Sequence, residues 1–131
     1  MNEVVVDTHA ILWYLYLPNR LSPAATAALN LASSSMIYLS AVSLVEVAYL
    51  IDKGRLPDIV LDQLTQATED PASGIVLAPV TPDVAQAVKR VPRKLVPDMP
   101  DRIIVATAVQ LGLPLVTADT QIQSSGIATI W

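Results

Sequence analysis

The chain has 131 residues, a formal net charge of −4 and no cysteine. This length favours one domain, residues 1–131, and the lack of cysteine excludes disulfides, thiolate zinc sites and cysteine nucleophiles. The acidic balance excludes a protein that holds nucleic acid through bulk positive charge. The single histidine, His9, excludes any site that requires two imidazoles.

Hydrophobic residues make up 53% of the chain, which is above the usual range for a globular domain. No apolar run approaches the roughly 18 to 20 residues that span a bilayer. The start, Met1-Asn2-Glu3, also lacks the positive charge of a signal peptide. We therefore expect a soluble, cytoplasmic protein without membrane association, whose excess apolar surface contacts a second copy or a partner.

Short apolar runs alternate with helical patterns along the whole chain. The expected strands are residues 3–7, 36–39, 75–77, 115–117 and 127–130. The expected helices are residues 8–16, 23–33, 41–52, 57–69, 82–90 and 100–111. This alternation predicts a three-layer α/β/α domain with a five-stranded parallel sheet.

Four carboxylates fall at unusual places in this pattern. Asp7 ends the first strand and Asp119 closes the fourth, at the edge where open α/β sheets bind ligands. Glu46 is the only charge in the middle of an apolar helix, and Asp101 opens the helix before the fourth strand. An isolated buried carboxylate costs several kcal/mol, so Glu46 requires a cation, a hydrogen-bond network or a metal.

Each acid taken alone also has a purely structural interpretation. Ser43 and Glu46 have the spacing of a capping box. Asp98, Asp101 and Asp119 stand where helix or turn caps occur. These interpretations stay open for single residues.

Considered together, Asp7, Glu46, Asp101 and Asp119 can gather at one rim of the sheet. Carboxylates so placed repel one another unless divalent cations neutralise them. Oxygen ligands favour hard ions such as Mg²⁺ or Mn²⁺. The pattern therefore suits metal-assisted phosphodiester hydrolysis by an activated water.

Four stretches of the chain resemble one known family. They are residues 4–13 (VVVDTHAILW), the Glu46 helix leading into DKGRL at 52–56, residues 97–106 (PDMPDRIIVA) and residues 115–119 (LVTAD). Together they resemble the PIN domain, and most closely the VapC-like ribonuclease toxins of type II toxin–antitoxin pairs. The resemblance covers essentially the whole chain and implies a PIN-like fold.

The resemblance also implies a Mg²⁺- or Mn²⁺-dependent endoribonuclease. Its metal site would consist of Asp7, Glu46, Asp101 and Asp119, with Thr8 and Thr117 orienting carboxylates or water. Pro100 stands where related sequences often have an aromatic residue, which leaves the contribution of Asp98 open. As partners, the resemblance implies an RNA substrate, a second copy of the chain in a homodimer, and a small antitoxin that reaches into the acidic site.

Other charged residues have weaker indications. His9 is expected to pack or cap beside Asp7 rather than to bind metal. Lys89-Arg90-Val91-Pro92-Arg93-Lys94 contains four of the eight basic residues; it is either a solvated face or a clamp for RNA phosphates, with Arg93 and Lys94 as the contacts. Arg102 is expected to pair with a carboxylate or to touch phosphate.

Three other functions compete with the ribonuclease. A phosphoacceptor receiver domain would require an acidic pair at the first strand and a lysine near a late strand, and the sequence has neither. A catalytically inactive PIN-like binding module is disfavoured because it would retain four mutually repelling acids without need. A nuclease acting on DNA shares the same chemistry, and the choice of RNA rests on the resemblance alone.

Overall fold

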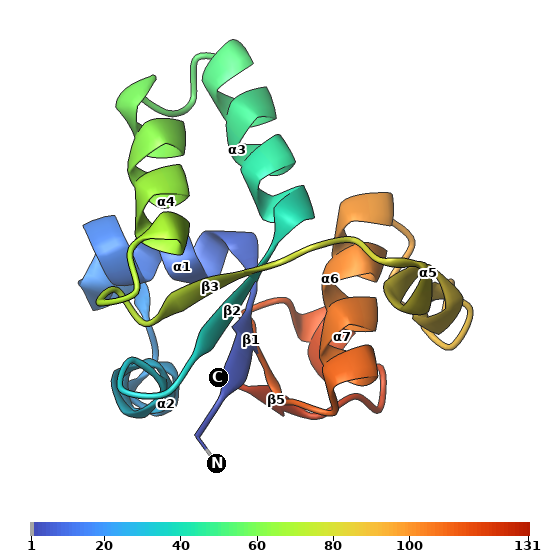
Figure 1. Ribbon diagram of the computed structural model, residues 1–131. Coiled ribbons are helices and arrows are strands. Elements are labelled where there is room, and N and C mark those ends of the chain that lie inside the picture. The colour runs from blue at the N-terminus through green and yellow to red at the C-terminus, as the bar shows by residue number, and fades with distance from the viewer. Residues whose placement is uncertain (1) are drawn as a thin grey trace.

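The strand β1 (Val4–Val6) lies at the centre of a five-stranded sheet. The computed structural model describes residues 2–131 and gives the strand order β3-β2-β1-β4-β5 (Figure 1). The flanking strands are β2 (Ile37–Ser40), β3 (Ile75–Ala78), β4 (Leu115–Val116) and β5 (Thr129–Ile130). Every neighbouring pair is parallel, so the predicted five-stranded parallel sheet is confirmed.

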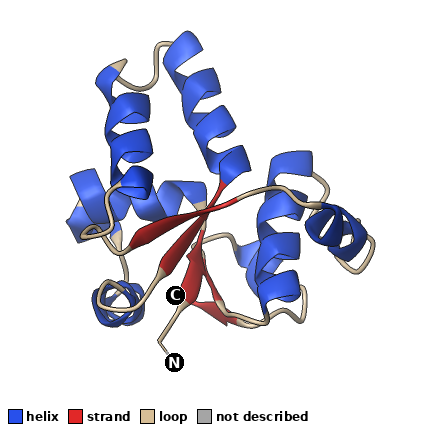
Figure 2. Cartoon of the chain, viewed as in Figure 1, coloured by secondary structure: helices blue, strands red, loops and turns tan. Residues whose placement is uncertain are grey.

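Helices cover both faces of the sheet, as the colouring in Figure 2 makes clear. The helices are α1 (Thr8–Tyr16), α2 (Pro23–Ala32), α3 (Ala41–Asp52), α4 (Ile59–Glu69), α5 (Pro82–Val88), α6 (Met99–Leu111) and α7 (Thr120–Gln123), with a 3₁₀ turn η1 (Pro18–Arg20). Within residues 2–131, none of them is long and apolar enough to cross a membrane.

Two hydrophobic cores lie on opposite faces of the sheet because side chains alternate along a strand. Val4 and Val6 join the core under α1, α2 and α4. Val5 joins the core under α5, α6 and α7. Val5 and Val6 are both completely buried, as expected for the central strand of a parallel sheet.

The register of the strands brings two chain segments together at the carboxyl edge. Val5 and Val6 pair with Leu115 and Val116. The backbone N–H of Asp7 donates to the carbonyl of Val116 at 3.0 Å. The residues that follow β1 and β4 therefore lie beside each other, although they are far apart in sequence.

Several predicted boundaries differ from the structure by one or two residues. The helix expected to reach residue 90 ends at Val88, because residues 89–91 form tight turns with N–H donors bonded three residues back. The last strand is only Thr129–Ile130, and the turn after Asp119 is the short helix α7.

Candidate active site

Asp7 stands where β1 ends and α1 begins, and its carboxylate is held from two sides. Oδ1 accepts the backbone N–H of Thr8 at 2.8 Å, and Oδ2 accepts the hydroxyl of Thr117 at 2.7 Å. The residue is only 3% exposed. The N-terminus of α1 thus fixes Asp7 at the carboxyl edge of the sheet, and hydrogen bonds to the ionised carboxylate stabilise it there.

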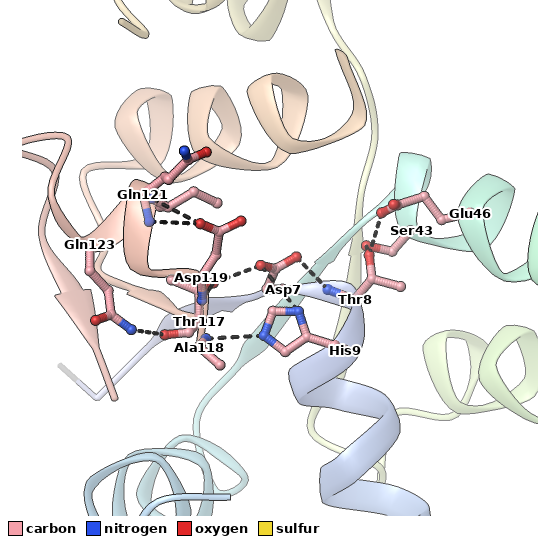
Figure 3. A network of polar contacts seen from close by, with 11 residues as sticks. Asp7, Thr8, His9, Ser43, Glu46, Thr117, Ala118, Asp119, Gln121 and Gln123 are labelled. Atoms are coloured by element: carbon pink, nitrogen blue, oxygen red, sulfur yellow. Dashed lines mark hydrogen bonds and ion pairs between the residues drawn. The ribbon is translucent and has the colours of Figure 1, made fainter. Parts of the chain in front are cut away.

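Thr8 connects α1 to α3 through Glu46. Its hydroxyl donates to Oε1 of Glu46 at 2.6 Å and lies 2.8 Å from the hydroxyl of Ser43. A threonine hydroxyl has one hydrogen, so Ser43 is the donor in the second bond. Figure 3 shows this chain of contacts beside Asp7. Thr8 therefore lies beside the acids, and its role in orienting carboxylates or water stays a prediction.

The capping box of Ser43 and Glu46, which was the structural alternative for Glu46, does not form. The helix begins earlier, at Ala41, because Ser40 is the N-cap and accepts the N–H of Val42 at 3.2 Å. Ser43 and Glu46 are three residues apart, so they share a helix face. Both side chains turn toward Thr8, and this spacing is the sequence signal that could have identified Ser43.

Asp119 and Thr117 form the second strand end of the site. Asp119 Oδ1 accepts the N–H groups of Gln121 at 2.9 Å and Ile122 at 3.1 Å, so the residue caps the turn that follows, which was the structural alternative for it. The Thr117 hydroxyl, which donates to Asp7, accepts the N–H of Asp119 at 3.1 Å. One buried hydroxyl therefore links the two acids.

His9 packs beside Asp7, as predicted. Its Nε2 accepts the N–H of Ala118 at 3.0 Å, which places the ring proton on Nδ1, 3.5 Å from Asp7 Oδ2. The ring also lies against Trp13, with centroids 5.0 Å apart. Both nitrogens are thus engaged with the protein, which favours a positioning role.

Asp101 is half-buried in the first turn of α6. No hydrogen bond or ion pair to its side chain occurs within residues 2–131. Burial, together with the negative charges of Asp7, Glu46, Asp119 and Asp98, raises the pKa of Asp101 to about 7. Four carboxylates therefore act on Asp101, which places all of them in one electrostatic environment.

The same surroundings affect Glu46. Burial is the main cause that raises its pKa, and the charges of Asp7 and Asp98 add to this effect. The hydrogen bond from Thr8 and the proximity of His9 act in the opposite direction. Asp98 occupies the N-cap position of α6, but its side chain makes no capping hydrogen bond.

The donor set fits a hard divalent cation in its chemistry. In the described part of the chain, no lysine or arginine forms an ion pair with Asp7, Glu46, Asp101 or Asp119, so their charge is uncompensated. No three acidic or histidine side chains among residues 2–131 converge closely enough to enclose an ion as they stand. The assignment of these four acids as metal ligands therefore stays a prediction.

Of the two alternatives for Arg102, pairing with a carboxylate is wrong. This residue is 9% exposed, and its guanidinium donates to the carbonyls of Val96 at 3.1 Å and Val88 at 3.0 Å. It therefore binds the backbone of the preceding loop instead of a carboxylate, and a contact between its remaining donors and phosphate stays a prediction. The sequence could not show this, because the contact depends on how the loop folds over α6. Arg93 and Lys94 are exposed.

The pattern of the PIN domain family matches residues 4–126. The chain belongs to the PIN domain family. This PIN domain is 34% identical to Ribonuclease VapC22 of Mycobacterium tuberculosis over 126 residues, which are 95% of the chain and 92% of that protein. The predicted VapC-like relationship is thus confirmed.

Solved structures show the same fold. The PIN domain superposes on a chain of VapBC2 from Rickettsia felis, bound to a promoter DNA fragment, with a TM-score of 0.68 and 13% identity, covering 97% of this chain and 96% of that one. A toxin–antitoxin complex from Klebsiella pneumoniae gives a TM-score of 0.66 and 19% identity, covering 98% and 96%. The predicted PIN-like fold is therefore confirmed.

Proposed function

We propose that this PIN domain is a Mg²⁺- or Mn²⁺-dependent endoribonuclease and the toxin of a toxin–antitoxin pair. The observation that carries the proposal is the uncompensated charge around Asp101, whose pKa rises to about 7 among four other carboxylates. Such a cluster costs stability and is explained by a cation that neutralises it. The identity to a protein called a ribonuclease supports RNA as the substrate.

In this proposal the cation would be held by Asp7, Glu46, Asp101 and Asp119. When bound, it supplies Lewis-acid activation of a water and stabilises charge on the leaving oxygen. The protein orients the carboxylates beforehand: Thr117 and the N–H of Thr8 fix Asp7, and the hydroxyl of Thr8 fixes Glu46. Because the pKa of Asp101 is about 7, its carboxyl group is protonated in part of the molecules near neutral pH. Cation binding would release that proton.

A small antitoxin is the proposed protein partner. The support comes from a fold relative that was solved as a toxin–antitoxin complex. On α3, Val45 is 66% and Tyr49 58% exposed, and both line a hollow that includes Glu46. Apolar side chains beside an acidic site suit a partner that covers the site. A homodimer is proposed as well, and light scattering after size-exclusion chromatography tests it.

Cleavage assays with matched variants test the nuclease proposal. Purified protein is incubated with single-stranded RNA or DNA in Mg²⁺, Mn²⁺ or EDTA. We expect cutting of RNA only with a metal, and a loss of about 100-fold or more in Asp7→Asn and Glu46→Gln. Asp62→Asn and Glu69→Gln, which change exposed acids on α4, should retain activity.

Two other results would overturn the proposal. Cutting that persists in both Asp7→Asn and Glu46→Gln would place the chemistry elsewhere. Folded protein that cuts no RNA, with a melting temperature unaffected by metal, would favour the inactive binding module. Faster cleavage of DNA than of RNA would change the proposed substrate from RNA to DNA and would leave the assignment of the acidic site unchanged.

A further inference from the structure

A cavity of about 900 Å³ lies between the end of α5, the loop of residues 89–98 and the start of α6. Its lining combines cations and apolar side chains, including Lys89, Arg93, Lys94, Pro92, Pro97 and Met99. No acidic residue lines it. In a chain with a net charge of −4, this is a local concentration of positive charge with walls of low polarity, which focuses the field on an anion.

Arg102 builds one wall of this cavity and holds the loop in place. Its guanidinium binds the carbonyl of Val88, where α5 ends, and that of Val96, near the start of α6. Both ends of the loop are therefore fixed to the same buried side chain. A preformed loop loses little conformational entropy when it binds a ligand.

The cavity adjoins the acidic site through the first turn of α6. Met99 and Arg102 line the cavity, and Asp101 lies between them in the chain. A cation held by carboxylates contacts one phosphate, whereas a bound RNA strand requires further contacts to its backbone. A cationic cavity that shares the first turn of α6 with the acidic site can supply these contacts.

We propose that this cavity binds the RNA backbone next to the cleaved bond. Lys89, Arg93 and Lys94 contact phosphates, and the side chains of Pro92, Pro97 and Met99 contact ribose or base. The assignment rests on the proposed ribonuclease function. An acidic protein segment would meet the same cations, but the neighbouring carboxylates would repel it, whereas they attract RNA through the metal.

Binding measurements distinguish specific binding of RNA in the cavity from non-specific attraction of RNA by surface charge. The affinity of a short fluorescent single-stranded RNA for Asp7→Asn protein is measured by anisotropy at several salt concentrations. Arg93→Ala and Lys94→Ala should each weaken binding several-fold and flatten the slope of log affinity against log salt by about 0.7. Arg90→Ala is the matched control, because Arg90 is exposed on the same segment but does not line the cavity.

The outcomes distinguish this assignment from the function on which it rests. An effect of Arg90→Ala equal to that of Arg93→Ala would overturn the site and indicate bulk charge. Polyglutamate that binds as tightly as RNA, and depends equally on Arg93, would assign the cavity to an acidic protein. If the Arg93→Ala protein binds RNA normally and the wild-type protein cuts RNA, the assignment of the cavity as an RNA-binding site is refuted and the ribonuclease function is not. Absence of RNA binding by every variant would refute the ribonuclease as well.

Arg102→Lys tests the fixed loop separately. Lysine retains the charge but cannot reach both carbonyls with a planar pair of donors. We expect weaker RNA binding than in the parent protein, together with a melting temperature lowered by a few degrees. Unchanged RNA affinity in a folded Arg102→Lys protein would overturn the role assigned to the guanidinium.

Discussion

The hydroxyl of Thr117 donates to Oδ2 of Asp7 at 2.7 Å and accepts the N–H of Asp119 at 3.1 Å. Thr117 is completely buried. The acids at the ends of β1 and β4 are therefore held in a fixed relation by one side chain. Replacing that side chain should disturb the acidic site without removing any charge.

Thr117→Val keeps the shape of the side chain and removes both hydrogen bonds. We expect a loss of about 1–2 kcal/mol in the free energy of unfolding, and slower cleavage because Asp7 loses a donor. Thr117→Ser should recover most of both quantities. The control is Thr107→Val in α6, whose hydroxyl donates only to the carbonyl of Ile103; it should leave cleavage unchanged. Urea unfolding and cleavage rates measure the effects, and normal cleavage by Thr117→Val would contradict the link.

The stability of the metal-free protein should depend on the charge of Asp101. Its pKa is about 7 in the folded chain against an ordinary value of 3.8, so between these pH values the folded state binds more protons than the unfolded state. Stability therefore falls as the pH rises through this window. In EDTA, Asp101→Asn should raise the melting temperature at pH 8 and change it little near pH 4.

The control for Asp101 is Asp62→Asn, which removes the same charge from an exposed position on α4. It should leave the difference in melting temperature between pH 4 and pH 8 as it is in the wild-type protein. Mg²⁺ should reduce that difference in the wild-type protein, because a cation relieves the repulsion. A wild-type pH profile retained in Asp101→Asn would contradict the electrostatic account.

His9 should matter more for stability than for chemistry. His9→Ala removes the acceptor for the Ala118 N–H and the ring contact with Trp13, so we expect a loss of about 1–3 kcal/mol. Cleavage should fall less than about 10-fold, because Asp7 retains its bonds to Thr8 and Thr117. His9→Gln, which can supply an acceptor, should recover part of the stability. A loss of cleavage as large as that of Asp7→Asn would instead indicate a direct role in the reaction.

Two glycines with similar backbone angles allow a matched test of packing. Gly74 has φ +76° and Gly54 has φ +71°. A Cβ at Gly74 would lie 2.3 Å from the carbonyl oxygen of Ser33, whereas a Cβ at Gly54 meets nothing within 4 Å. Gly54→Ala should cost about 1–2 kcal/mol from the left-handed conformation alone. Gly74→Ala should lower the free energy of unfolding by clearly more, because the backbone at Ser33 must move to make room for the Cβ. Urea unfolding of both variants measures the two losses, and equal losses would contradict this prediction.

The positions of the strand-end acids follow from the sequence. Three valines ending in Asp7 and the LVTAD segment ending in Asp119 have the composition of buried parallel strands. Parallel strands place their carboxyl ends on one edge, so the proximity of the two acids is a consequence of topology. Their hydrogen bonds to Thr8 and Thr117 also match the predicted supporting roles.

The remaining contacts depend on tertiary packing that no local pattern contains. The hydroxyl of Thr8 forms hydrogen bonds with Glu46 and Ser43, which lie 38 and 35 positions further along the chain. These bonds form only because α1 and α3 pack against each other at a suitable angle. Arg102 was expected to pair with a carboxylate or to touch phosphate, but its guanidinium binds the carbonyls of Val88 and Val96. Consecutive residues of a helix point in different directions, and the guanidinium lies on the side of the loop.

The hydrogen bond between Thr117 and Asp7 joins residues 110 positions apart. During synthesis β1 is made before β4, and Thr117 follows Asp7 by 110 positions. A growing chain therefore carries Asp7 and Glu46 long before it can assemble the complete group of acids. In the proposed ribonuclease, cleavage of RNA would therefore begin only after the segment with Asp119 has been made and has folded beside β1.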